Sequence, residues 1–160
     1  MNVAIVFLVV LISLFVLAYF TKRRFGVLGL ALAAGSMLSE LWAVQLTPLV
    51  RDAGLVVQNP PLITIVSVVL VLLPAAFLLF SGPSYHDTFK RVVGALLFAA
   101  LAFALLIEPL GSALVLQDEG RLVYEFFRDN RVYIVTVGLI IAVLDLLGTH
   151  TSRAHKASKH

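Results

Sequence analysis

The chain contains no cysteine, which excludes disulfides, thiolate chemistry and cysteine-ligated metal sites. It also lacks a glycine-rich phosphate loop, an HExxH motif and a nucleophile elbow, the signatures of several common enzyme classes. His150, His155 and His160 recur every five residues near the C-terminus, but their surroundings offer no rigid frame for a metal ion. We therefore expect a protein that is not an enzyme and that holds no cofactor and no structural metal.

Charge is scarce as well. Only 13% of the 160 residues are charged, whereas 61% are hydrophobic, and the mean hydropathy is +1.03. The net charge of +3 could indicate nucleic-acid binding, but the basic residues stand at the ends of apolar runs. Basic residues in that position orient membrane proteins. The composition predicts that the chain interacts with a lipid bilayer and not with nucleic acid.

Long apolar runs predict an all-α integral membrane protein with one transmembrane domain over residues 1–148. About 20 apolar helical residues cross a hydrocarbon core of roughly 30 Å. We expect Pro48 to end the second run, Pro109 to end the fourth, and Pro74 to kink the third. The five expected spans cover residues 3–20, 25–46, 62–80, 92–110 and 132–147. The last has only 16 residues, so four spans plus a re-entrant or surface helix is the alternative.

Residues 119–129 have a different pattern, in which Leu122, Val123, Phe126 and Phe127 recur at helical spacing among charged residues. This pattern predicts a short amphipathic helix at the membrane surface, with a solvated helix packed on its neighbours as the alternative. Residues 149–160 are basic and rich in histidine, and we expect them to form a disordered cytoplasmic tail.

The distribution of basic residues predicts the topology. No basic residue precedes the first apolar run, unlike in a cleavable signal peptide, so we expect a retained helix. With the N-terminus outside, four of the 12 basic residues fall outside, namely Arg51, Arg121, Arg128 and Arg131. The other eight fall on the cytoplasmic side, namely Lys22, Arg23, Arg24, Lys90, Arg91, Arg153, Lys156 and Lys159. This bias supports five spans and a cytoplasmic C-terminus.

The second apolar run carries small residues along one face. Gly26, Gly29, Ala33 and Ser36 follow one another at spacings of three and four residues, and the same face leads to Glu40. Small residues at this spacing let two helix backbones approach closely. We therefore expect a helix-packing seam along this row and not a ligand pocket.

Two carboxylates are the best candidates for a site. Glu40 lies 15 residues beyond Phe25, roughly 22 Å along a helix, and Glu108 lies at a matching depth in the fourth run. A carboxylate in a membrane costs about 3 kcal/mol to insert and usually faces the protein interior or a water-filled cavity. One interpretation is a shared cavity that holds a proton or a cation. The alternative is that both lie near the outer interface and reach water or an arginine, such as Arg51 or Arg131.

Asp145 stands near the cytoplasmic end of the last run. The basic clusters expected on that side lie within reach, so we expect a topology-setting ion pair with Arg23, Arg24 or Arg91. Asp145 is therefore interpreted as a topology residue and not as part of a binding site.

Residues 22–43 read KRRFGVLGLALAAGSMLSELWA, a basic turn followed by a small-residue helix. Residues 86–106 read HDTFKRVVGALLFAALAFALL, a basic turn that feeds a helix rich in glycine, alanine and leucine. With these two stretches, residues 3–110 resemble the colicin V production (CvpA) family of small bacterial inner-membrane proteins. The resemblance implies a non-enzymatic protein of the bacterial cytoplasmic membrane, linked to bacteriocin export and envelope homeostasis, and it carries over no catalytic residue.

These features leave two functions open. The first is a small scaffold or accessory protein in envelope homeostasis or export, which forms a homo-oligomer or docks another membrane protein through the small-residue row. The second is a small transporter or channel-like protein that uses Glu40 and Glu108. Whether these two carboxylates face each other, lipid or solvent discriminates between them.

Overall fold

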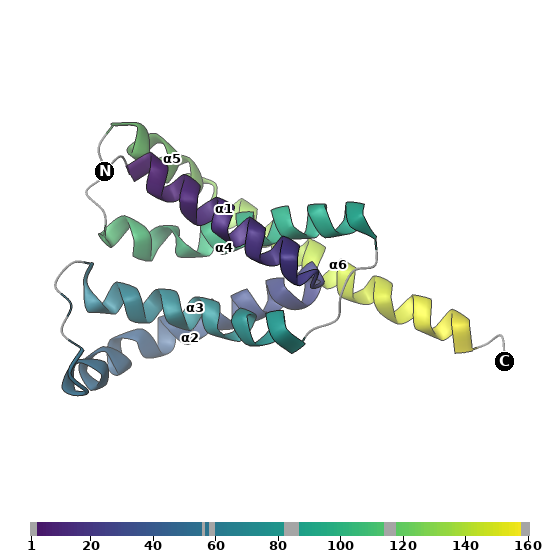
Figure 1. Cartoon of the computed structure of the whole chain (residues 1–160), viewed down its shortest axis with the longest axis horizontal. Coiled ribbons are helices and arrows are strands. Elements are labelled where there is room, and N and C mark those ends of the chain that lie inside the picture. The colour runs from purple at the N-terminus through teal and green to yellow at the C-terminus, as the bar shows by residue number, and fades with distance from the viewer. Residues whose placement is uncertain (1–2, 56, 58–59, 82–86, 114–117, 158–160) are drawn as a thin grey trace.

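A computed structural model describes residues 3–55, 57, 60–81, 87–113 and 118–157. These residues form helices and no β-strand, as the composition predicts (Figure 1). The helices are α1 (Val3–Thr21), α2 (Phe25–Asp52), α3 (Leu62–Ser81), α4 (Thr88–Ala113), α5 (Asp118–Asp129) and α6 (Arg131–Ala157). The expected all-α fold is confirmed.

Four of these helices are long and apolar enough to cross a membrane. The apolar segments are Phe25–Asp52 in α2, Leu62–Phe80 in α3, Thr88–Gly111 in α4 and Arg131–Gly148 in α6. α1 contributes a shorter apolar stretch, Ile5–Thr21. Many large apolar side chains on α1, α2, α3 and α6 are exposed, which suits helices that face lipid.

Two helices continue past the prolines that were expected to end them. α2 runs through Pro48 to Asp52, and α4 runs through Pro109 to Ala113. A proline removes one helical hydrogen bond, but membrane helices tolerate it when nearby polar groups and neighbouring helices compensate. Directly before the α2 proline, the Thr47 hydroxyl donates a hydrogen bond to the Ala43 carbonyl at 2.6 Å, next to the Val44 carbonyl that Pro48 leaves without its helical donor. The helices therefore extend past the expected ends of the second and fourth spans.

α6 is also longer than expected at its C-terminal end, since it continues through residues 149–157, where we expected a tail. Residues 158–160 lie outside the described residues, and so do the side chains of residues 149–157. The predictions for the histidines and basic residues of this segment therefore stay predictions.

α4 lies at the centre of the helical core. All residues from Leu101 to Ile107 are buried, and α4 contacts α1, α2, α3, α5 and α6. α2 and α3 form an antiparallel pair on one side of α4, whereas α1 and α5 cover another side (Figure 1). Residues from α2, α3, α4 and α6 can therefore meet around the face of α4 that turns away from α1.

Backbones approach closely at the small-residue row of α2. A Cβ atom on Gly26 would lie 2.6 Å from the Ala142 carbonyl oxygen on α6, and one on Gly29 would lie 3.0 Å from the Ala142 Cβ. Ala33 and Ser36, further along the row, are half-buried. The first half of the expected seam thus packs within the chain, against α6.

A third glycine, Gly35, brings α2 against α3. A Cβ atom on Gly35 would lie 2.2 Å from the Val71 carbonyl oxygen. This contact was not expected, because Gly35 lies outside the row at three- and four-residue spacing. α2 therefore touches α6 near its beginning and α3 near its middle, in each case where only glycine fits.

Two arginines, one just before α2 and one in the first turn of α4, contact neighbouring helices. The Arg23 guanidinium donates hydrogen bonds to the carbonyls of Leu79, at 2.8 Å, and Phe80, at 2.6 Å, in the last turn of α3. The Arg91 guanidinium lies 3.8 Å from the centre of the Tyr19 ring. Carbonyls at a helix C-terminus carry partial negative charge, so Arg23 stabilises the end of α3.

Asp145 accepts a hydrogen bond from the Gly26 backbone N–H at 2.9 Å. This places the Asp145 carboxylate at the N-terminus of α2, where the helix dipole favours negative charge. Lys22, Arg24 and Lys90 stand at the same end of the fold, with Lys22 in a left-handed conformation at φ 56°. The expected ion pair of Asp145 with an arginine stays a prediction.

A helix is present where the amphipathic pattern predicts one, and it packs on α1 and α4. The Phe103 ring on α4 makes edge-to-face contacts with Phe7, at 5.6 Å between ring centres, and with Phe127, at 4.6 Å. Gly111 leaves room for the Tyr124 ring, since a Cβ atom there would lie 2.2 Å from it. α5 is therefore held by aromatic contacts along one side.

Candidate functional site

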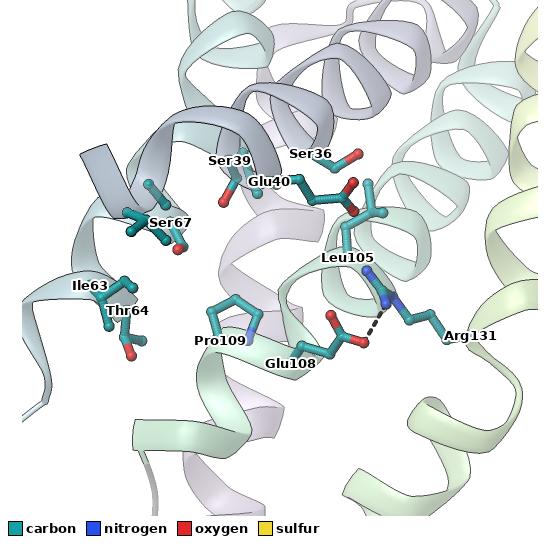
Figure 2. Close-up of a pocket in the computed structure, with 13 residues that line it drawn as sticks. Ser36, Ser39, Glu40, Ile63, Thr64, Ser67, Leu105, Glu108, Pro109 and Arg131 are labelled. Carbon is teal, nitrogen blue, oxygen red and sulfur yellow. Dashed lines mark hydrogen bonds and ion pairs between the residues drawn. The ribbon is translucent and has the colours of Figure 1, made fainter. Parts of the chain in front are cut away.

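One pocket joins α2, α3, α4 and the start of α6, and it has a volume of about 340 Å³. Figure 2 shows Glu40, Glu108 and Arg131 extending toward this space from three different helices. The pocket combines charged side chains, hydroxyl groups and an apolar wall. Its lining residues are Ser36, Ser39, Glu40, Ala43, Val44, Ile63, Thr64, Ser67, Val71, Leu105, Glu108, Pro109 and Arg131.

Glu40 reaches the pocket from the middle of α2. Residues Ser36, Glu40 and Ala43 fall on one face of the helix because they are four and three positions apart. The Glu40 carboxylate makes no hydrogen bond and no ion pair with any residue that the structure describes. It is exposed to the pocket and not enclosed by side chains.

Glu108 and Arg131 form an ion pair across the pocket wall. An Arg131 guanidinium N–H donates a hydrogen bond to a Glu108 carboxylate oxygen, which joins α4 to the start of α6 (Figure 2). The Arg131 side chain is 25% exposed and the Glu108 side chain 57%. Glu108 therefore has the arginine contact that the sequence left open as an alternative, whereas Glu40 has none among the described residues.

Hydroxyl groups and a proline add polar character beside the carboxylates. Thr64 is buried at 4% exposure and Ser67 is half-buried, both on α3, and both line the pocket. Pro109 has no N–H, so the carbonyl of Leu105, one turn earlier in α4, lacks its usual helical donor. Oxygen atoms of this kind are suitable partners for a hydrated cation or a polar ligand.

The pocket contains charges of both signs. Two carboxylates and one guanidinium face the same space, and it contains no histidine. Among the described residues, no group of three His, Asp or Glu side chains lies close enough to hold a metal ion. The pocket thus offers one unpaired carboxylate, one neutralised carboxylate and several hydroxyls.

The structure brings together some of the residues singled out by sequence and separates others. Glu40 and Glu108 line the same pocket, and Ser36 from the small-residue row joins them. The remaining small residues and the basic residues near Asp145 lie elsewhere in the fold. The sequence pattern did not indicate Ser39, nor that Thr64 and Ser67 would line the same pocket as the carboxylates. Helical spacing on α3 groups these last two side chains, but it gives no partner for that face.

Comparison with protein-family models, with curated proteins and with solved structures finds no match for the chain. The resemblance to the colicin V production family therefore stays a prediction.

Proposed function

We propose that the chain is a small multi-pass membrane protein that binds a cation in the pocket between α2, α3, α4 and α6, as a transporter or channel-like protein. The observation that carries this proposal is the Glu40 carboxylate, which has no partner among the described residues and lines one pocket with the Glu108–Arg131 ion pair. The substrate is a proton or a small cation.

The topology that accompanies the proposal has five spans, α1 to α4 and α6, in a bacterial cytoplasmic membrane. α1 has 19 helical residues, which at about 1.5 Å per residue is close to the ~30 Å hydrocarbon thickness. The excess of basic residues on one side supports an outside N-terminus and a cytoplasmic C-terminus. In this arrangement the pocket opens toward the outer half of the bilayer, and α5 lies at the outer surface.

An unpaired carboxylate in a membrane helix needs a compensating interaction. Inserting it costs about 3 kcal/mol, so it has to be protonated, hydrated or matched by positive charge. The hydroxyls of Ser36 and Ser67 lie in the same pocket and can replace part of a cation's hydration shell. Arg131 already binds Glu108 and so does not balance the charge of Glu40. A cation bound in the pocket would balance that charge instead.

The scaffold function has less support from the geometry. It relied on the small-residue row of α2 as a free docking surface, but α6 covers Gly26 and Gly29 within the same chain. The accessory role in export or envelope homeostasis, with a homo-oligomer or another membrane protein as partner, therefore rests on the sequence resemblance alone.

The proposal is tested by flux measurements on the purified protein in liposomes, with dyes that report protons, Na⁺ and K⁺. We expect a flux that Glu40→Gln abolishes, because the variant removes the unpaired charge while keeping the side-chain shape. Glu125→Gln is the matched control, since Glu125 pairs with Arg121 on α5 and does not line the pocket. Absence of flux, or equal flux in the wild type and Glu40→Gln, overturns the proposal.

A further inference from the structure

We propose that Arg131 is a built-in cation that neutralises Glu108 and thereby restricts the pocket to a ligand with a single positive charge, held by Glu40. This inference rests on the proposed function and names its substrate class. Arg131 is then the residue that determines which charge the pocket accepts, and Glu40 and Glu108 have different roles although both are carboxylates.

The position of Arg131 is fixed by the junction between α5 and α6. Arg131 is the first residue of α6, and the Asn130 side chain before it donates a hydrogen bond to the Phe126 carbonyl at 2.8 Å. The Asn130 carbonyl accepts the hydrogen bond from Ile134 N–H, at 2.9 Å, that starts the helix. The guanidinium therefore enters the pocket from an anchored backbone and not from a loose loop.

The charge balance of the pocket follows from these contacts. Glu40 and Glu108 contribute two negative charges and Arg131 one positive charge, so the lining carries a single net negative charge. A ligand whose charge balances the net charge of the lining is favoured over one that leaves excess charge within a membrane segment. A monovalent cation or a proton restores neutrality, whereas a divalent cation leaves one positive charge too many.

The two carboxylates are not interchangeable in this scheme. Glu108 keeps Arg131 occupied, and Glu40 is left to bind the ligand. If Glu108 loses its charge, Arg131 is released and is free to neutralise Glu40, which then has no capacity for a cation. Removing Arg131 as well frees Glu40 again and restores the single negative charge.

The decisive experiment is a double-mutant cycle measured as Na⁺ binding to the purified protein by calorimetry at neutral pH. Coupled charged residues commonly change affinity by tenfold or more. We expect Glu108→Gln to weaken Na⁺ binding by about tenfold or more, and Glu108→Gln combined with Arg131→Gln to return the affinity to within about threefold of the wild type. A double variant that binds as weakly as Glu108→Gln overturns the inference.

Single substitution of Arg131 gives an independent result. Arg131→Gln leaves two negative charges in the pocket, so we expect Ca²⁺ to bind about tenfold more tightly than it does to the wild type. Arg131→Lys keeps the charge and should retain the preference for Na⁺. Arg121→Gln on α5 is the matched control and should leave both affinities unchanged, because Arg121 is not part of the pocket. Unchanged Ca²⁺ affinity in Arg131→Gln contradicts the inference.

A second measurement distinguishes an alkali ion from a proton. Infrared difference spectra recorded as the pH is lowered report a protonated carboxyl, and we expect this signal to disappear in Glu40→Gln if the ligand is a proton. If the ligand is a proton, the double-mutant cycle is measured by this infrared signal instead of by Na⁺ binding. If Glu40-dependent flux persists but neither readout shows rescue, this inference fails while the proposed function stands. If no Glu40-dependent flux or binding is found, both fail.

Discussion

Arg131, the first residue of α6, binds the carboxylate of Glu108, which lies 23 positions earlier on α4. Between them the chain leaves α4, forms α5 and turns into α6. The ion pair therefore closes the α4–α6 segment on itself and completes one wall of the pocket. Glu40, on the opposite wall, belongs to a part of the chain that this closure does not involve.

Neutralising Glu40 should stabilise the protein while it removes binding. The carboxylate has no partner among the described residues, so Glu40→Gln removes an uncompensated charge from a membrane helix. We expect the melting temperature in detergent to rise by about 2–4 °C, the usual shift for 1 kcal/mol in a chain of this size. Glu108→Gln should lower it, because Arg131 loses its partner. A lower melting temperature for Glu40→Gln would show that this residue has a structural partner.

Gly26→Ala should separate α2 from α6. The new Cβ atom would lie 2.6 Å from the Ala142 carbonyl oxygen, which is closer than a carbon and an oxygen atom can approach. The backbones of α2 and α6 therefore have to move apart. We expect a loss of about 1–3 kcal/mol, measured by thermal unfolding in detergent. Gly148→Ala is the matched control, since no atom lies within 4 Å of its Cβ position and alanine is the better helix former. Equal effects of the two substitutions would argue against close packing at Gly26.

Arg23→Gln should weaken the end of α3. The substitution removes hydrogen bonds from a guanidinium to the carbonyls of Leu79 and Phe80, and such bonds contribute about 1.5–3 kcal/mol each. We expect a melting temperature several degrees below that of the wild type. Lys22→Gln removes the same charge from the same turn, so it controls for any effect on membrane orientation. The contact with α3 is unimportant if both variants melt at the same temperature.

Phe127→Ala should loosen α5 without unfolding the rest of the molecule. The Phe127 ring packs edge-to-face on Phe103, whereas the neighbouring Phe126 ring is 60% exposed. Buried aromatic pairs add about 0.5–1.5 kcal/mol beyond the burial of their area. We expect faster amide hydrogen exchange across residues 118–129 in Phe127→Ala and a smaller change in Phe126→Ala. The reverse order would mean that the exposed face of α5 carries the important contacts.

The absence of cysteine makes the topology directly measurable. Ala53 follows the C-terminal end of α2 and Thr88 begins α4, and both residues are exposed. We expect a membrane-impermeant thiol reagent to label Ala53→Cys in intact cells and Thr88→Cys only after the membrane is permeabilised. Labelling in the opposite order would invert the proposed orientation.

Much of the fold could be predicted because apolar runs and membrane thickness constrain helices strongly. The helix ends were harder to predict at Pro48 and Pro109, since a proline stops a soluble helix but is tolerated inside a membrane helix. The small-residue row was predictable from its spacing, but the spacing does not indicate which helix packs against it. Gly35 was missed for the same reason, since only the position of Val71 explains it.

The candidate site was predictable in part from helical rise. Counting residues put Glu40 and Glu108 at one depth, and they line one pocket. The choice of Arg131 over Arg51 as a partner could not be made from sequence, because it depends on how α5 folds back toward α4. The sequence could not show that the hydroxyls of Thr64 and Ser67 belong to the pocket, because this depends on the position of α3 beside α2.

The distribution of pocket residues along the chain has a consequence for biosynthesis. Glu40 is synthesised 68 residues before Glu108, so α2 leaves the ribosome before either Glu108 or Arg131 exists. In the proposed topology, α2, the least apolar of the four long helices, enters the bilayer while its carboxylate has no partner among the described residues. In the proposed topology, the order of translation thus makes the helix that carries Glu40 insert before α4 and α6, which complete its pocket.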